Sequence, residues 1–300
     1  MIRKAMFKLL LIMATLFCAA LPGATPCLAQ MQLPGATVLP PAAPGAPAGA
    51  GILPLGKKAP RKTGGASRDS SFGKPPGEEA IGERPLYQNG AAGAMEFARR
   101  DKALQIRKLV FRGEQLAKPG EACDVSVAVT GGLTATPAGT PSGLAHYDVE
   151  LEACPFSFDI LDDAILVSSP NLVCEFKQAG CQVSPSGLWG PPPASFTPAK
   201  AKDIERARTR WETAVRASFR DALARAKDQG EIKQAARSQA GFSSERETQC
   251  RDYAGEATYG FCAARITQAR AFALRAKTGQ LVAQHAAEKP GKAGKKRKRR

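Results

Sequence analysis

Histidine is almost absent from this sequence. The 300 residues include only two, His146 and His285, and they lie far apart. Histidine is the usual general base and a common metal ligand, and we interpret both residues as surface side chains. The GxSxG and HExxH motifs and a Cys/His pair in a catalytic context are also missing. The sequence therefore predicts a protein that is not an enzyme, with no catalytic residue, no metal site and no cofactor.

Candidates for acid–base catalysis are equally few. Asp162-Asp163 and the pair Glu150 and Glu152 bring carboxylates close together in the sequence. Neighbouring acids in a turn or on the polar face of a strand are usually solvated, so we interpret both pairs in that way. The dipeptide Gly131-Gly132 is typical of a turn and not of a phosphate-binding loop.

Long apolar runs are confined to the N-terminus. Arg3, Lys4 and Lys8 form a charged segment, and residues 9–17 form an apolar stretch that is too short to span a bilayer. This pattern predicts a signal peptide over residues 1–29 that is cleaved after Ala29. No second stretch is long enough to span, so we expect a periplasmic or secreted protein that is at most peripheral to the membrane.

The CxxC spacing of zinc and redox sites does not occur. Signal cleavage removes Cys18 and Cys27, and neither of them follows a good lipobox. An even number of cysteines in an exported chain indicates a disulfide framework. The six that remain are Cys123, Cys154, Cys174, Cys181, Cys250 and Cys262.

The first four of these cysteines allow three pairings. Local geometry favours Cys174–Cys181, which closes a hairpin, and Cys123–Cys154, which joins two strands. The sequence alone leaves this connectivity open.

Composition divides the chain into segments. Residues 30–90 are rich in Pro, Ala and Gly and predict a disordered linker. Residues 91–195 predict a small antiparallel β-domain, because apolar and polar residues alternate from Cys123 to Thr130 and again around Tyr147. Within it, we expect a short helix over residues 91–103 and an edge strand over residues 105–112.

Residues 196–285 predict a helix bundle. Ile204, Trp211 and Val215 recur at helical spacing in the first helix, which should end near Gly230. A second helix covers residues 231–239, and the capping box Ser244/Glu247 begins a third. A fourth helix begins near Phe261. The predicted fold class is α+β: a small disulfide-bonded antiparallel β-domain followed by a small helix bundle, with a disordered N-terminal linker and C-terminal tail.

Acidic residues are outnumbered by basic ones, 27 to 43, and the excess is concentrated in a polybasic tail over residues 286–300. Clustered Lys and Arg bind polyanions. Export favours an anionic envelope surface over nucleic acid, and the tail has no interleaved aromatics on which bases could stack. The candidate surface-binding residues are Lys295, Lys296, Arg297, Lys298, Arg299 and Arg300.

Trp189 stands between a glycine and a proline-rich turn in residues 186–193. Two interpretations stay open. The side chain is either a hydrophobic plug held by a rigid turn or an exposed aromatic that contacts a ligand.

The segment 242–274 carries a recognisable spacing of residues. An aromatic, an Arg-acid pair and a cysteine are followed by a second cysteine, then Thr, Arg and Leu five, eight and twelve residues later; these are Phe242, Arg246, Glu247, Cys250, Cys262, Thr267, Arg270 and Leu274. The pattern resembles the lysozyme-inhibitor LprI-like family of small helical bacterial envelope domains. The sequence departs from that family in having Phe242 where Trp is usual and no cysteine in residues 182–249.

The resemblance implies a non-enzymatic binding domain, with inhibition of lysozyme as one form of that activity, and a Cys250–Cys262 disulfide. That bridge would close a 13-residue loop, which stabilises the fold by about 3 kcal/mol in the chain-entropy model. We expect Arg270 to form an ion pair inside the bundle with Glu245 or Glu247.

Together these observations predict an exported, non-enzymatic envelope-binding protein whose partner is an anionic envelope surface or another protein. The alternative is a structural envelope protein that is tethered to peptidoglycan or lipopolysaccharide through its basic tail. A third interpretation is a hydrolase with an atypical site in the β-domain.

Overall fold

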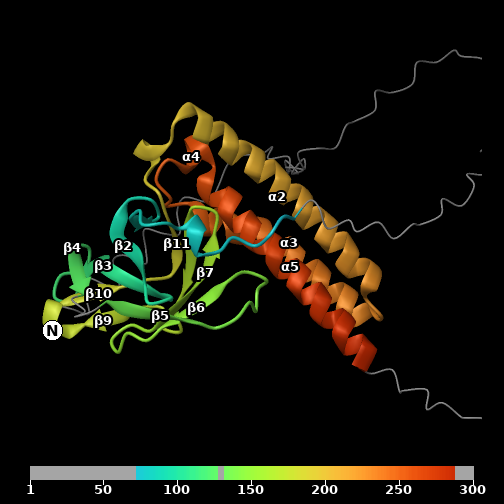
Figure 1. The fold of residues 1–300 in the computed structure, drawn as a ribbon, viewed down its shortest axis with the longest axis horizontal. Helices are drawn as coiled ribbons and strands as arrows, with labels where there is room; N and C mark the ends of the chain where they lie inside the picture. Colours follow the sequence, from blue (N-terminus) through green and yellow to red (C-terminus); the bar gives the residue numbers. More distant parts are fainter. Residues whose placement is uncertain (1–71, 128–131, 288–300) are drawn as a thin grey trace, which may run out of the picture. The chain divides into compact units, whose positions relative to one another are not determined.

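The computed structural model describes residues 72–127 and 132–287, which form an α+β fold with the strands before the long helices (Figure 1). The predicted signal peptide, most of the predicted linker and residues 288–300 of the tail lie outside the described residues. The strands are β1 (Leu86–Gln88), β2 (Ala92–Arg100), β3 (Ala103–Gln115), β4 (Ala122–Val127), β5 (Leu133–Pro137), β6 (His146–Val149), β7 (Phe156–Leu161), β8 (Ala164–Ser168), β9 (Cys174–Phe176), β10 (Cys181–Val183) and β11 (Gly187–Gly190).

Eight of these strands close into a barrel. Hydrogen-bonded neighbours follow the order β2-β1-β11-β8-β7-β6-β5-β3, and β3 pairs back onto β2. All pairings around this ring are antiparallel. The long β3 extends beyond the ring, where it pairs with β4 and with β10, and β10 carries β9. The predicted antiparallel β-domain is confirmed, and its closure into a barrel is a feature that the sequence did not reveal.

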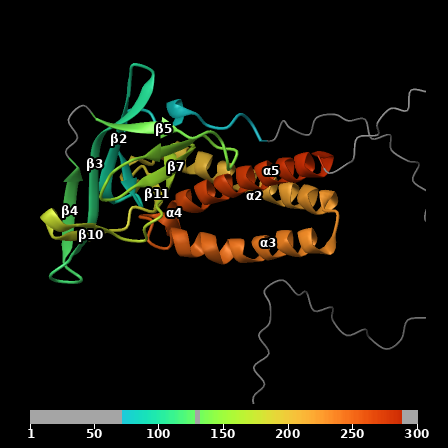
Figure 2. The same ribbon diagram turned by 90° about the horizontal axis from the view of Figure 1, so that it is seen from below.

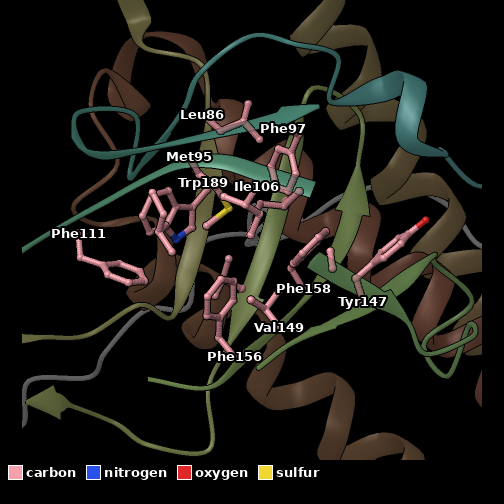
Figure 3. Packing of buried hydrophobic residues seen from close by; sticks show 14 of the residues in the cluster. Leu86, Met95, Phe97, Ile106, Phe111, Tyr147, Val149, Phe156, Phe158 and Trp189 are labelled. Atoms are coloured by element: carbon pink, nitrogen blue, oxygen red, sulfur yellow. The ribbon is translucent and has the colours of Figure 1, made fainter. Parts of the chain in front are cut away.

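Apolar side chains fill the barrel (Figure 3). Phe97, Phe158 and Trp189 are at most 1% exposed, and Tyr147 stacks on Phe158 with ring centroids 5.3 Å apart. Trp189 Nε1 donates a hydrogen bond to the carbonyl oxygen of Pro185 at 2.9 Å, so its polar atom is satisfied. Burying a large apolar side chain stabilises the fold by about 1.5–3 kcal/mol, which makes this cluster the main source of the barrel's stability.

Four α-helices lie among the described residues, and α2, α3 and α5 run side by side (Figure 2). They are α2 (Pro198–Arg225), α3 (Gln229–Cys250), α4 (Glu256–Tyr259) and α5 (Phe261–Ala287), with short 3-10 turns η2 (Glu78–Ala80), η3 (Lys177–Ala179) and η4 (Pro193–Ser195). Side chains satisfy the free amides at the helix starts. Thr197 and Asp228 cap α2 and α3, and Glu256 accepts from the amides of Cys262 and Ala263 at the start of α5.

The helices pack against one wall of the barrel. Because strand residues alternate between two faces, Trp189 points into the barrel while Leu188 points outward. Leu161 and Ala164 at the β7–β8 turn join Leu188 in a second apolar cluster. Its helical members include Ile204, Trp211, Phe261 and Phe272. The outer face of the sheet is therefore apolar on this wall, whereas the alternation of apolar and polar residues predicts a polar outer face. Every described helix is too short or too polar to cross a lipid bilayer.

The Cys250–Cys262 disulfide is confirmed. The other two predicted bridges are wrong, because the described structure joins Cys123–Cys181 and Cys154–Cys174.

The strand register explains the error. In the β9–β10 hairpin, Cys181 lies opposite Phe176 and Cys174 lies opposite Val183, so the two cysteines do not face each other. Cys123 on β4 reaches Cys181 on β10 across the intervening β3. Gly113 on β3 is the Cα partner of Cys123, and a Cβ there would lie 1.9 Å from the carbonyl oxygen of Gln182.

Three further predictions, one about the end of the linker and two about secondary structure, differ from the structure. The linker does not extend to residue 90, because Phe72 packs on Trp211, Ile81 is buried and β1 begins at Leu86. Residues 91–103 form the strand β2 and not a helix, because pairing with β1 and β3 outweighs the helix propensity of Ala, Met, Glu and Arg. The predicted edge strand 105–112 is the central β3.

The predicted second and third helices are one continuous helix in the structure. Helix α3 continues through Gly241, and the Ser244/Glu247 pair lies inside it instead of capping a new helix. A glycine in a helix costs only about 1 kcal/mol relative to alanine. The buried Phe242 and the bridged Cys250 on the same helix offset that cost.

Candidate functional site

A pocket of about 520 Å³ lies where the β7–β8 turn meets α2 and α5, and we call it the basic pocket. Charged side chains from three segments converge on it. Its lining residues are Ala80, Asp162, Asp163, Lys200, Asp203, Ile204, Arg206, Ala207, Arg210 and Arg265.

The two adjacent aspartates form the tip of the β7–β8 hairpin. Leu161 pairs with Ala164, so Asp162 and Asp163 are the two turn residues between the strands. Asp163 has a φ of 56°, in the left-handed region that aspartate tolerates better than most residues. The backbone amide of Asp162 donates to Gln268 Oε1 on α5 at 3.3 Å, which ties the turn to that helix.

Four cations surround these two carboxylates. Lys200, in the first turn of α2, donates to Asp163 Oδ2, and Arg84 donates to Asp163 Oδ1 at 2.8 Å. Arg210 Nη2 and Arg265 Nη1 each lie 3.7 Å from Asp162 Oδ2. The last two distances are too long for direct hydrogen bonds, so both guanidinium groups keep donor capacity beside Asp162.

Arg265 is the most unusual of the four. Only 3% of the residue is exposed, and its Nε and Nη1 atoms are buried without a hydrogen-bond partner. Its guanidinium lies over the ring of Phe261, 4.8 Å from the centroid. A buried charge is costly unless it is paired and hydrogen-bonded. A lining residue with two vacant donors is therefore suited to an acceptor placed in the pocket.

Burial and charge oppose each other in the ionisation of this cluster. Burial lowers the pKa of the Arg265 guanidinium below its ordinary value, although Asp162 and Asp163 act against that shift. Burial alone would raise the pKa of Asp163, but its hydrogen bond to Lys200 and the charges of Lys200 and Arg265 lower it below the usual range. The lining of the pocket holds four basic side chains, Lys200, Arg206, Arg210 and Arg265, and three aspartates, Asp162, Asp163 and Asp203.

This arrangement can bind an anionic group. Charge-assisted hydrogen bonds from Arg to a carboxylate or phosphate are about twice as strong as neutral ones. Arg210 and Arg265 approach from α2 and α5, so an acceptor between them would contact both helices. Among the described residues, no group of three or more His, Cys, Asp or Glu side chains is placed to hold a metal ion.

The structure separates the predicted site residues. Trp189 is 0% exposed inside the barrel, so the interpretation as a ligand-contacting surface aromatic is wrong and the hydrophobic plug is the observed role. The tail residues Lys295 to Arg300 lie outside the described residues. His146 and His285 are partly buried and lie 2.7 and 2.8 Å from Asp159 and Glu231, so they are not simply surface side chains.

Sequence reasoning missed the basic pocket. Asp162-Asp163 was the available signal, and an adjacent acidic pair in a turn looks like a solvated turn. Lys200, Arg210 and Arg265 are spread over 66 residues of sequence, within helices where basic residues are frequent. Their convergence depends on the docking of the hairpin tip between two helices.

Phe242 and Arg246 on α3 meet Thr267 and Arg270 on α5 at a contact that we call the α3–α5 seam, whereas Glu247 of the same family-like pattern is exposed. Arg246 Nη1 donates to Thr267 Oγ1 at 3.1 Å, and the guanidinium carbons of Arg246 and Arg270 lie 5.5 and 5.4 Å from the ring centroid of Phe242. Arg270 donates to the carbonyl and hydroxyl oxygens of Ser238 at 2.7 and 2.9 Å, and these are its hydrogen-bond partners in place of Glu245 or Glu247. The α3–α5 seam holds α3 against α5, and none of its residues lines the basic pocket.

A second pocket of about 430 Å³ lies at η2, above the barrel residues Phe97 and Leu104. Tyr147 donates to Glu78 Oε1 at 2.7 Å, and Arg99 pairs with Glu78 Oε2 at 2.7 Å. Burial, together with the Glu78 hydrogen bond, raises the pKa of Tyr147 to about 12. Glu78 already pairs with both Tyr147 and Arg99, although its buried Oε2 accepts no hydrogen bond, so this pocket is a weaker candidate for an anion site.

Comparisons with known proteins found no relative. No family model matches the sequence, and neither the curated proteins nor the solved structures include a significant match. The function must therefore be argued from the barrel, the helices and the basic pocket themselves.

Proposed function

We propose that this protein is an exported, non-enzymatic binding protein of the bacterial envelope and that the basic pocket holds an anionic group of its ligand. The buried guanidinium of Arg265, with two donors that have no partner, is the observation that carries the proposal. Arg210 lies beside the same carboxylate as Arg265, that of Asp162, and 53% of the Arg210 side chain is exposed. An arriving anion would therefore meet one exposed and one buried guanidinium.

The disulfide bonds support the proposed export of the protein from the cytoplasm. Three disulfides are compatible with a periplasmic or extracellular protein. Convergence of the family-like residues at the α3–α5 seam supports the resemblance to the lysozyme-inhibitor LprI-like family as a proposal about the helices. Inhibition of lysozyme, or of another envelope-acting protein, is accordingly the activity that we propose to test first.

A second candidate function is a structural tether. The eight basic residues of the chain's last twelve favour attachment to an anionic envelope polymer such as lipopolysaccharide. The two functions differ in the residues they need, because the tether depends on the tail and the binding protein on the basic pocket.

The test is an NMR titration of the full mature protein with malonate and, separately, with phosphate. The reporter is the Nε–H resonance of Arg265. We expect that resonance to shift and to saturate with at least one anion. Arg210→Gln should weaken the binding by about tenfold, because it removes one charge-assisted hydrogen bond.

Arg208→Gln is the matched control, because it removes the same charge from another face of α2, where Arg208 pairs with Glu212. The tail is present in every variant, so its own anion binding is common to all of them. An Arg265 resonance that does not respond to either anion would refute the proposed pocket. Equal weakening by Arg208→Gln and Arg210→Gln would show a general charge effect and would also refute it.

A further inference from the structure

We infer that Asp162 is a built-in competitor at the anion site of the basic pocket, and that the anionic group of a ligand binds by displacing the Asp162 side chain from between Arg210 and Arg265. The inference rests on the proposed function, because it concerns the same two guanidinium groups. It adds the residue that sets the affinity of the site.

The carboxylate of Asp162 lies where a ligand's anion would have to bind. Its Oδ2 atom is 3.7 Å from Arg210 Nη2 on α2 and 3.7 Å from Arg265 Nη1 on α5. One oxygen atom thus bridges the two helices that the ligand would also bridge. A second anion between the same guanidinium groups would lie against Asp162 and be repelled by its charge.

The side chain of Asp162 is held more weakly than its backbone. Within the described residues its carboxylate forms ion pairs but accepts no hydrogen bond, because 3.7 Å is beyond hydrogen-bond distance. Its side chain is also 38% exposed. The backbone amide, in contrast, donates to Gln268 Oε1 on α5. The carboxylate can therefore turn toward solvent while the β7–β8 turn stays in place.

Asp163, the neighbouring acid, has a different role. Its carboxylate accepts hydrogen bonds from both Lys200 and Arg84, and only 22% of its side chain is exposed. Displacing it would break two charge-assisted hydrogen bonds. Asp162 is therefore the acid of this turn that a ligand can replace.

Arg265 provides the independent observation that points to such a replacement. Only 3% of the residue is exposed, and its Nε and Nη1 atoms have no hydrogen-bond partner although a carboxylate is close by. Asp162 thus balances the charge of the guanidinium without satisfying its donors. An anion that is not anchored to the turn can approach closely enough to do both.

The experiment repeats the NMR titration of the full mature protein with malonate on the variant Asp162→Asn. Asparagine has nearly the same shape and is also favoured in turns, but its neutral amide is a weaker acceptor for a guanidinium than a carboxylate is. We expect the Arg265 Nε–H resonance to saturate at a malonate concentration at least about tenfold lower than in the unmodified protein.

Asp203→Asn is the matched control. Asp203 also lines the basic pocket, but its carboxylate accepts from Arg206 at 2.9 Å on the exposed side of α2. This variant removes the same charge from the pocket lining without vacating the space between Arg210 and Arg265. Because exposed charges are screened by solvent, it should change malonate affinity by less than about threefold.

Asp162→Glu tests the same contact without any change in charge. Asp163, and not Asp162, has the positive φ in this turn, so the backbone accepts glutamate at position 162. The additional methylene lets the carboxylate reach hydrogen-bond distance of the two arginines, which makes it a stronger competitor. Malonate binding should weaken by about fivefold or more, and this variant decides the question even if Asp162→Asn does not fold.

The outcomes separate the two proposals. If Arg265 responds to malonate in the unmodified protein but Asp162→Asn binds no more tightly, or Asp162→Glu no more weakly, the competitor role is wrong and the proposed function stands. Equal strengthening by Asp203→Asn would show a general charge effect and would also overturn the inference. If Arg265 responds in none of these proteins, the proposed function and the inference fail together. A response in Asp162→Asn alone would support the competitor role while refuting anion binding by the unmodified protein.

Discussion

The barrel and helix α3 are held in place by different means. Inside the barrel, apolar side chains from all eight ring strands share one buried cluster. Each ring strand also pairs with a strand on either side of it. Helix α3 has 22 residues but buries only Phe242 and Cys250. Its other attachments include the hydrogen bonds of the α3–α5 seam, the ion pair of Arg246 with Glu212 on α2, and the pair formed by Glu231 and His285.

This contrast shows where the disulfides are needed. Both bridges of the strand region tie down strands outside the ring: β4 to β10, and β9 to the loop before β7. The third bridge ties α3 to α5. In each case the disulfide fixes an element that lies outside the closed ring of strands. Three predictions test this interpretation, and we give the largest expected effect first.

Trp189→Ala should lower the free energy of unfolding by about 4 kcal/mol, because it leaves a large cavity in the barrel core. The measurement is urea unfolding followed by far-UV circular dichroism. Strand and helix signals should be lost together, because the helices pack on the barrel wall. Leu172→Ala is the control, since Leu172 is 87% exposed and its loss should cost less than about 0.5 kcal/mol. Similar losses in both variants would contradict a barrel-centred core.

The double variant Cys250→Ser/Cys262→Ser should lose about 3 kcal/mol in the chain-entropy model. Its effect should be local. Hydrogen exchange should show α3 amides losing protection while the barrel strands keep theirs. Cys154→Ser/Cys174→Ser is the control, because it removes a bridge of similar sequence separation, 20 residues against 12, and should leave α3 protected. Equal exchange of α3 in the two double variants would show that the bridge does not hold this helix.

Asp163→Asn should lower the free energy of unfolding by about 1 kcal/mol at pH 7, because it removes the charged acceptor of Lys200 and Arg84. Asparagine also tolerates the left-handed backbone of this turn. The folded-state pKa of Asp163 lies below its unfolded value, near 3.9. Its contribution is therefore present above that value and is lost as the pH falls through the folded-state pKa.

The measurement for Asp163→Asn is the unfolding free energy as a function of pH. The difference from the unmodified protein should be constant near neutrality and shrink below about pH 4. Asp101→Asn is the matched control, because Asp101 has a φ of 50° and lies in an exposed hairpin turn. A difference that persists unchanged into acid would mean that the charge of Asp163 is not what stabilises the turn.

Local patterns in the sequence were sufficient for part of this fold. Alternation predicted the strands β4 and β6, and helical spacing predicted α2, because these segments bury one consistent face. The Cys250–Cys262 bridge was also predictable, since it joins the ends of two neighbouring helices. Export, the resemblance to the inhibitor-like family and the function remain predictions.

Long-range pairing accounts for what could not be predicted. Strand β2 consists largely of helix-favouring residues and is a strand because β1 and β3 flank it. The bridge of Cys123 to Cys181 depends on β3 lying between their strands. The basic pocket has the same character: Arg265 looks like any arginine of an amphipathic helix until the β7–β8 turn is docked beside it.

The pairing of β1 with β11 has a consequence for how the protein forms. Tyr87 lies opposite Gly190, so the ring cannot close until a stretch of about a hundred residues has emerged and folded back. Sheets dominated by such distant pairings fold on the order of milliseconds to seconds, far more slowly than helical bundles. During that interval the edge of β1 that later pairs with β11 is open to other chains. A chaperone that shields this edge would therefore raise the yield of native protein more than one that assists the helices.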